Sequence, residues 1–177
     1  VISITQSKNK YHLTQERFSL LGKKYLEKWI IPICYLTTEN KAFTTILKSK
    51  SLTLSSKCDW IKFNYHQPGF FSVKYSPSLL STVGSLIPTK KISHLDAAGI
   101  ENDLYSLTIA LQYSLYDYLN FIEKYCLDAE YPLNASISGH LGWIFRISKN
   151  TGLENNVRKT SLLFHLQQLK RIGWERK

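Results

Sequence analysis

Val73-Lys74-Tyr75-Ser76-Pro77-Ser78-Leu79-Leu80 decides the fold, because the period of the hydrophobic pattern changes within this stretch. Before Ser76, apolar and polar residues alternate in short runs, as they do in half-buried β-strands. Ser76-Pro77 has the pattern of a helix N-cap followed by a first-turn proline. From Ser78 onward, apolar residues recur at helical spacing. The sequence therefore predicts a β domain over residues 1–75 and a helical domain over residues 76–177.

Upstream of this change, the alternating runs are separated by turn residues, which is typical of a β-sandwich. Ser7-Lys8-Asn9-Lys10 predicts the turn of a first hairpin, and Pro68-Gly69 suits the centre of a type II turn. Lys28–Thr37 is apolar on both faces, which favours a central strand, and Pro32 predicts a bulge or an unpaired stretch within it. Seven strands fit an immunoglobulin-like sandwich: a hairpin over 2–15 and strands near 28–37, 42–47, 52–55, 60–64 and 70–75.

Downstream, helices are expected near residues 77–86, 93–111, 114–127, 133–149 and 153–172. Buried stripes are assigned to Leu104, Leu107, Leu111, Leu115, Leu119 and Ile122, and in the last helix to Leu162, Leu166 and Leu169. Short loops predict antiparallel helix pairs, the building unit of an α-solenoid. Because no polar terminal cap follows Gly173-Trp174, we expect a truncated solenoid that continues in a longer parent protein.

Composition narrows the class of protein. With 177 residues, 44% of them hydrophobic and 20% charged, the chain can build packed cores. No apolar run reaches the roughly 18 residues of a membrane span, and the longest, Trp29–Leu36, contains Pro32. The sequence has no Met and no signal-peptide pattern. Its odd number of cysteines leaves a free thiol, which favours a reducing compartment such as the cytoplasm: Cys34, Cys58 and Cys126.

Most of the net charge of +10 belongs to the first 75 residues, which carry 12 Lys and Arg against 4 acids. The other 102 residues carry 11 against 9. A basic surface can attract nucleic acid or anionic lipid. These lysines stand singly at strand ends and turns, however, so we interpret them as solvated and edge-protecting: Lys8, Lys10, Lys28, Lys41, Lys48, Lys50, Lys57, Lys62 and Lys74.

Aromatic residues in the last predicted hairpin could form a stacking surface for single-stranded nucleic acid. They are Tyr65, Phe70, Phe71 and Tyr75, with Lys62 and Lys74 nearby. A strand pair with two consecutive Phe residues must bury at least one of them, and sandwich cores use aromatic residues freely. We therefore favour a core role for this group.

Motifs of common enzymes are absent. The sequence has no H-E-x-x-H, G-x-S-x-G, G-x-x-x-x-G-K or G-x-G-x-x-G. A nucleophilic Cys126 would need His140 or His165 beside it, and a buried thiol on a helix is the more frequent state. Two acid pairs, Asp128 with Glu130 and Asp96 with Glu101, fit helix starts and solvated faces better than acid–base catalysis. We predict no catalytic residue and no metal ligand in this chain.

Several short motifs follow one another in a characteristic order. They are Leu13–Phe18, Trp29–Ile33, Trp60–Asn64, Gly69–Ser76, Gly99–Leu107, Glu130–Pro132, Leu141–Gly142 and Arg171–Trp174. In this order and spacing, from about Leu13 to Trp174, the chain resembles zinc-dependent aminopeptidases of the puromycin-sensitive type. Phe71 and Ser72 depart from that family's Tyr and Arg, and Ala97 departs from the Arg that follows its Asp. Two arginines that could pair with acids across the domain boundary are thus absent.

The resemblance implies a four-part enzyme: an N-terminal β domain, a thermolysin-like catalytic domain, a small β-sandwich, and a helical C-terminal domain that closes over the active site. This chain would be the sandwich and the start of the helical domain. The zinc ligands and the general-base Glu would lie upstream, so no catalytic residue is carried over. The implied partners are the parent's catalytic domain, the rest of its helical domain and its peptide substrates.

Three hypotheses remain open at this stage. The first is a non-catalytic scaffold and lid segment of a zinc aminopeptidase. The second is a free-standing immunoglobulin-like binding module with a helical appendage, although no Cys pair bridges two sandwich strands. The third is a basic nucleic-acid-binding domain, which would show a salt-dependent affinity for polynucleotides.

The strand assigned to Trp60–Asn64 gives a first test of the predicted core. Replacing Trp60 with Ala should lower the free energy of unfolding by roughly 3 to 5 kcal/mol, because a cavity of indole size opens. Chemical denaturation measures this change. An unchanged denaturation midpoint would place Trp60 on the surface and contradict the strand register.

Overall fold

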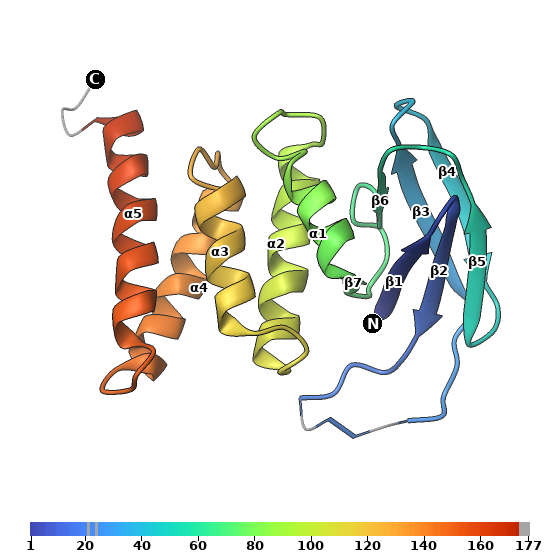
Figure 1. Ribbon diagram of the computed structural model, residues 1–177, viewed down its shortest axis with the longest axis horizontal. Coiled ribbons are helices and arrows are strands. Elements are labelled where there is room, and N and C mark those ends of the chain that lie inside the picture. Colours follow the sequence, from blue (N-terminus) through green and yellow to red (C-terminus); the bar gives the residue numbers. More distant parts are fainter. Residues whose placement is uncertain (21, 24, 174–177) are drawn as a thin grey trace.

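The computed structural model describes residues 1–20, 22–23 and 25–173 (Figure 1), so Trp174 of the last motif lies outside the described residues. The strands are β1 (Ile2–Ser7), β2 (Lys10–Gln15), β3 (Ile31–Thr37), β4 (Ala42–Leu47), β5 (Ser51–Ser55), β6 (Ile61–Phe63) and β7 (Val73–Tyr75). The helices are α1 (Pro77–Gly84), α2 (His94–Ile109), α3 (Leu115–Tyr125), α4 (Leu133–Ser148) and α5 (Glu154–Ile172). The predicted fold class, strands followed by antiparallel helices, is confirmed.

Two sheets form the sandwich, with strand orders β5-β2-β1-β7 and β4-β3-β6. β1 and β2 make the predicted hairpin, in which Ile2 lies opposite Gln15. Buried side chains of both sheets share one core, where the rings of Tyr11 and Phe63 lie 6.2 Å apart. β7 pairs in parallel with β1, so the last strand starts at the end of the sandwich where the chain begins. This four-plus-three division fits the immunoglobulin-like arrangement.

The central strand β3 is shorter than predicted. It begins at Ile31 rather than Lys28, and Trp29 and Ile30 are exposed. The backbone of Trp29 is bound by the side chain of Gln15 instead of a neighbouring strand. The apolar run therefore begins in the loop before β3, so its first residue does not mark the start of the strand.

Pro32 has a strand partner on one side only. It lies opposite Ile46 of β4, whereas β6 pairs with β3 only at residues 35–37. Its missing N–H therefore falls beside an unpaired stretch, one of the two alternatives expected from the sequence.

The helices stack in two layers, as an α-solenoid does: α1, α3 and α5 contact one another in order, and α2 contacts α4 (Figure 1). The Ser93 and Ser114 side chains cap α2 and α3. Ser76 occupies the predicted N-cap position of α1, and Pro77 its first turn, but Ser76 makes no capping hydrogen bond. No helix in the described part of the chain is both long and apolar enough to cross a membrane.

One predicted buried stripe was partly wrong, and the stripe predicted for the last helix was wholly wrong. Leu104, Leu107, Leu119 and Ile122 are buried, but Leu111 is exposed because the chain leaves α2 before it and turns there with a φ of 57°. Leu162, Leu166 and Leu169 are exposed on the outer face of α5. The buried residues of α5 are Val157, Thr160, Phe164 and Gln168. Both faces of this helix hold apolar residues, so periodicity could not identify the buried one.

A matched pair of substitutions tests the orientation of α5. Phe164→Ala should lower the free energy of unfolding by about 3 to 5 kcal/mol, because Phe164 is fully buried. Leu166→Ala, at a residue that is 53% exposed, should change it by less than about 0.5 kcal/mol. Urea denaturation of both variants measures these values. Equal losses, or a larger loss for Leu166, would contradict the orientation.

Candidate functional site

A buried ion pair joins the sandwich to the helices. Lys62 of β6 and Asp96 in the first turn of α2 have side chains that are 2% and 0% exposed, and Lys62 Nζ lies 3.2 Å from Asp96 Oδ1. Lys62 Nζ also donates hydrogen bonds to the backbone oxygens of Phe63 and Asn64. Burial lowers the pKa of Lys62, and the charge of Asp96 opposes this shift. The interpretation of Lys62 as a solvated lysine was wrong, because Asp96 of α2 binds it where the sandwich meets the helices. We call this contact of β6 and β7 with Asp96, Asp103 and Tyr113 the joint.

Asp96 also fixes the loop between β6 and β7. Its Oδ1 accepts a hydrogen bond from the backbone N–H of His66 at 2.9 Å. The side chain of Asn64 closes the loop by binding both the N–H and the carbonyl of Gly69. Asn64, His66 and Gln67 have φ values of 52°, 62° and 57°, a region that costs free energy for residues other than glycine. The surrounding hydrogen bonds thus hold a strained loop in one shape.

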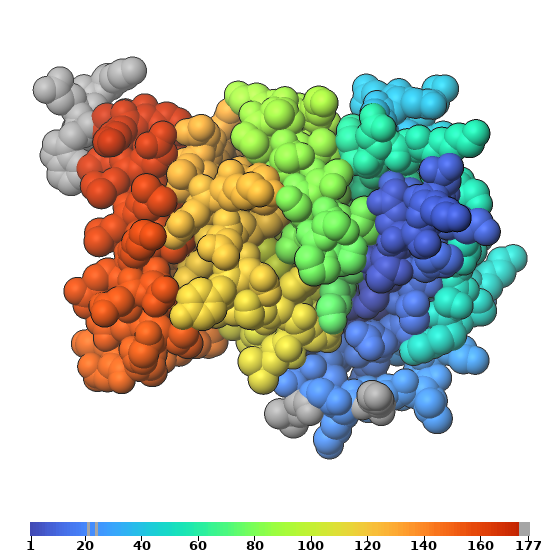
Figure 2. Space-filling view, in the orientation of Figure 1, coloured from blue at the N-terminus to red at the C-terminus, as the bar shows by residue number. Residues whose placement is uncertain are grey.

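Further hydrogen bonds connect β7 to the helices. Asp103 of α2 accepts from the backbone N–H of Val73 at 2.9 Å. Tyr113, between α2 and α3, donates its hydroxyl to the carbonyl of Tyr75. In Figure 2 the helical residues in green pack directly against the strand residues in blue and cyan. The sandwich and the helices are therefore held at a fixed spacing by polar and apolar contacts together.

Asp103 is the electrostatically costly member of this joint. Burial raises the pKa of its carboxyl to about 6, although the hydrogen bond from Val73 and the charge of Lys62 act in the opposite direction. Ser72 and Ala97, where the resembled family has arginines, bring no charge to the joint. Lys62 is a buried cation of this region, and it is paired with Asp96.

A second carboxylate, Glu101, ties α2 to α3 and α4. It accepts hydrogen bonds from Tyr118 Oη at 2.6 Å and Ser136 Oγ at 2.5 Å, and His140 Nδ1 lies 2.8 Å from it. The ring of Tyr105 stacks on His140 with centroids 3.6 Å apart. The expectation of a solvated face was wrong for Glu101, which is fully buried. With its oxygens occupied, Glu101 acts as a structural acceptor that links three helices.

No nucleophilic site forms around Cys126. This thiol is buried at the end of α3, and burial raises its pKa. His140 Nδ1 is engaged by Glu101, and His165 Nδ1 lies 2.7 Å from the carbonyl of Ser161. The burial of this thiol expected from the sequence is confirmed.

The other acid pair lies at the surface. Asp128 accepts a hydrogen bond from Gln167, and Glu130 forms an ion pair with Lys90 at 2.8 Å and lies 3.2 Å from Nε2 of His94. The hydrogen bond and charge of Lys90 lower the pKa of Glu130. These carboxylates therefore stabilise contacts between loops and helices.

The aromatic group predicted for the last hairpin does not form a stacking surface. Tyr75 is buried, Tyr65 and Phe71 are half-buried, and Phe70 is fully exposed. Because Lys62 is also buried, the combination of exposed rings and exposed lysines needed for single-strand binding is not assembled here. The preference for a core role was correct for Tyr75, and Phe70 is its exception.

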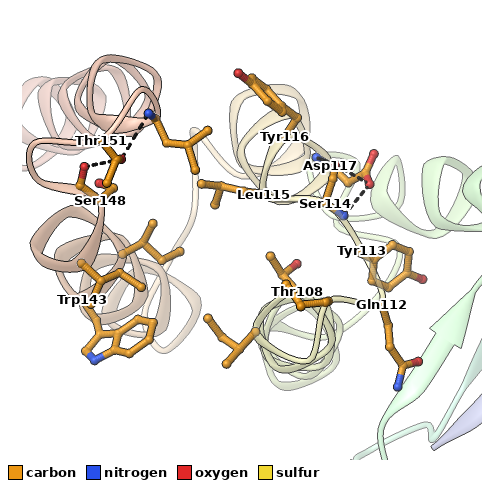
Figure 3. A pocket seen from close by; sticks show the side chains of 15 residues that line it. Thr108, Gln112, Tyr113, Ser114, Leu115, Tyr116, Asp117, Trp143, Ser148 and Thr151 are labelled. Carbon is orange, nitrogen blue, oxygen red and sulfur yellow. Dashed lines mark hydrogen bonds between the residues drawn. The ribbon is translucent and has the colours of Figure 1, made fainter. Parts of the chain in front are cut away.

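An apolar pocket of about 830 Å³ lies where α2 ends, α3 begins, and α4 and α5 meet (Figure 3). Its walls include Leu111, Leu115, Trp143 and Ile147. The carboxylate of Asp117 at its rim is used in the cap of α3. The pocket therefore suits apolar contact better than acid–base chemistry. Sequence reasoning missed it, because Leu111 was assigned to a buried stripe.

Zinc, which the resemblance implies for the parent enzyme, does not fit the residues of this region. Within residues 1–20, 22–23 and 25–173, no three His, Cys, Asp or Glu side chains come close enough together to hold a metal ion. Zinc sites use three or four such ligands.

Comparison with protein families agrees with these observations. Residues 60–177 match the family described as the ERAP1-like C-terminal domain, and the chain therefore belongs to this family. The match begins at Trp60, so it includes β6 and β7 together with the helices. The predicted resemblance to the C-terminal region of metalloaminopeptidases is confirmed.

Several curated relatives are named aminopeptidases, and others are named as a protease-interacting factor. Tricorn protease-interacting factor F2 of Thermoplasma acidophilum is 29% identical over 177 residues, which is all of this chain and 21% of the relative. Aminopeptidase M1-C of Oryza sativa subsp. japonica is 27% identical over 191 residues, covering all of this chain and 22% of the relative. Aminopeptidase M1 of Arabidopsis thaliana is 29% identical over 157 residues, covering 77% and 18%. The chain thus spans about a fifth of the length of the curated relatives it matches.

The raised pKa of Asp103 predicts a specific pH dependence. Its folded pKa of about 6 exceeds the ordinary value of 3.8, so the folded state binds the proton more tightly. The resulting stabilisation is complete below about pH 3.8 and is lost as the pH rises through about 6. Asp103→Asn removes this titration, so the variant should be more stable than the wild type at pH 7.5 by up to about 3 kcal/mol.

The advantage of Asp103→Asn should shrink as the pH falls from 7.5 to 4, and urea denaturation at several pH values measures it. The same change at an exposed carboxylate, Asp59→Asn, is the control, and should stay within about 0.5 kcal/mol of the wild type. An Asp103 variant that is less stable at pH 7.5 than at pH 4, relative to the wild type, would show that the carboxylate charge stabilises the joint.

Proposed function

We propose that this chain is a non-catalytic scaffold and lid segment of a zinc metalloaminopeptidase that removes N-terminal amino acids from peptides. The observation that carries the proposal is membership in the ERAP1-like C-terminal domain family, together with relatives named aminopeptidases that match this chain from end to end. Catalysis would belong to a domain upstream, where zinc activates a water molecule for attack on the peptide bond. No residue of this chain is assigned to that step.

The joint between sandwich and helices supports a spacer role. A lid must stay at a set distance from the active site if it is to admit the ends of peptides and keep folded proteins out. The Lys62–Asp96 pair and the hydrogen bond from Val73 to Asp103 restrain the spacing between the sandwich and the helices. We propose that residues 1–75 act as the spacer and residues 76–177 as the beginning of the lid.

The outer face of α5 supports continuation of the helical domain. Leu162, Leu163, Leu166, Leu169 and Ile172 are all exposed there. An apolar face of this length on a stacked helix is the kind of surface that a further repeat covers in a solenoid. The proposed partners are therefore the rest of the helical domain, the catalytic domain of the same polypeptide and its peptide substrates. We also propose a cytoplasmic location, on the basis of the free cysteines.

The proposal predicts where peptidase activity resides. The chain 1–177 should not hydrolyse aminoacyl substrates with or without added zinc, because its described part brings together no set of metal ligands. The full-length gene product should release N-terminal amino acids and lose that activity when zinc is chelated. Release of a chromogenic aminoacyl amide measures both.

Zinc-dependent hydrolysis by the chain 1–177 alone would overturn the scaffold assignment. If the full-length protein is inactive with zinc bound, the scaffold role would stand, and the proposed aminopeptidase activity would be rejected. Binding of a polynucleotide that weakens with added salt would favour the nucleic-acid hypothesis instead.

A further inference from the structure

The apolar pocket has the volume of a small-molecule site. Its volume of about 830 Å³ lies within the roughly 300 to 1,000 Å³ that is usual for such sites. Its walls come from the end of α2, the first turn of α3, the second half of α4 and the loop before α5. Figure 3 shows Thr108, Leu115 and Trp143 around one central space. A ligand in this space would contact three helices at once.

The side-chain donors of the lining are not available to a ligand. Each serine and threonine hydroxyl of the lining already donates to another group of the protein: Thr108, Ser114, Ser148 and Thr151. The hydroxyl of Tyr113 donates to the carbonyl of Tyr75. In Figure 3 the Gln112 amide, the Tyr116 hydroxyl and the Trp143 indole N–H point away from the central space. A strong hydrogen-bond acceptor buried in this space would therefore lose its hydration without replacement.

The charge of the lining disfavours an anion. Asp117 is the one charged residue among the fifteen that line the pocket, all of which the structure describes. The N-terminal N–H groups of α3 would by themselves attract an anion. Asp117 lies in that same turn, however, and its carboxylate opposes this attraction. The lining thus offers an anionic ligand no cation to pair with.

One wall of the pocket is an aromatic ring whose orientation is fixed from behind. The ring of Tyr105 contacts that of Trp143 edge-on, with centroids 6.3 Å apart and planes at 84°. Tyr105 in turn stacks on His140, whose Nδ1 lies 2.8 Å from the buried carboxylate of Glu101. Trp143 is nevertheless 37% exposed, so part of its ring is free. A wall that is already ordered favours an aromatic ligand, because stacking on it costs little side-chain entropy.

We propose that this pocket binds a small, uncharged aromatic molecule. The ring system of the ligand fills the space between α2, α3 and α4, contacts Trp143 and the apolar side chains around it, and makes no ion pair. Size, the lack of free donors, the sign of the one lining charge and the ordered indole all favour this class of ligand. Because neither zinc nor a peptide takes part, the site is independent of the proposed function.

Two dyes that differ by one charged group test the proposal on the chain 1–177. N-phenyl-1-naphthylamine is uncharged, and 8-anilino-1-naphthalenesulfonate is the same molecule with a sulfonate added. Titrations followed by the methyl NMR signals of Leu111, Leu115 and Ile147 report occupancy of the pocket itself. The uncharged dye should bind there at least about tenfold more tightly, because the sulfonate would be buried without a donor or a cation.

Equal or tighter binding of the sulfonate in the pocket would overturn the proposal. So would shifts of the uncharged dye confined to Leu162, Leu166 and Leu169, because they would assign binding to the outer face of α5. Pocket signals that move with protein concentration in the absence of dye would also overturn it, because they would show that a second copy of the chain occupies the pocket.

A matched pair of charge variants tests the reason for the selectivity. Ile147→Lys places a cation at the pocket wall, and Leu166→Lys makes the same change at a similarly exposed residue on the outer face of α5. Ile147→Lys should shift the ratio of the two affinities toward the sulfonate by at least about tenfold, and Leu166→Lys should change it by less than about twofold. Equal shifts would assign the selectivity to the net charge of the chain and contradict the proposal. The wild-type titration remains a complete test whether or not the Ile147 variant folds.

Discussion

The buried ion pair between Lys62 and Asp96 is the constraint on which the joint depends. Removing either charge alone would leave the other buried without a partner, which is far costlier than replacing both. The pair also holds β6 and α2 in a fixed relative orientation, because Lys62 is on the short strand β6 and Asp96 is in the first turn of α2. A strand of three residues has little stability of its own, so β6 depends on the helices for its position. The sandwich and the helices thus share one folding unit at their boundary.

The family match begins at Trp60 rather than at the first helix, so it includes β6 and β7. β6 and β7 belong to the sandwich by their hydrogen bonds, yet their side chains and loops bind Asp96, Asp103 and Tyr113 from the helical part. A substitution in either part would be felt in the other. The stability of the joint therefore depends on residues in both halves of the chain.

Most of the fold could be predicted from the sequence, because turn residues and hydrophobic period are local signals. The hairpin around Lys8-Asn9, the change at Ser76-Pro77 and all five helices followed from them. The joint could not be predicted in this way. Nothing near Lys62 in the sequence distinguishes it from the exposed Lys48, since its partner is 34 residues away in α2. The same applies to Glu101, whose donors Tyr118 and Ser136 come from two later helices.

Apolar residues were the other source of error, and they share one physical cause. Trp29, Leu111 and Leu166 were all read as buried because pattern analysis treats apolar character as burial. Apolar residues of a self-contained domain are buried on average, so the assumption usually holds. It fails where an apolar patch is part of a contact surface. The three errors fall on three different surfaces: the loop before β3, the apolar pocket and the outer face of α5. Residues that pattern analysis wrongly places in the core therefore mark apolar side chains that the described part of the chain leaves exposed.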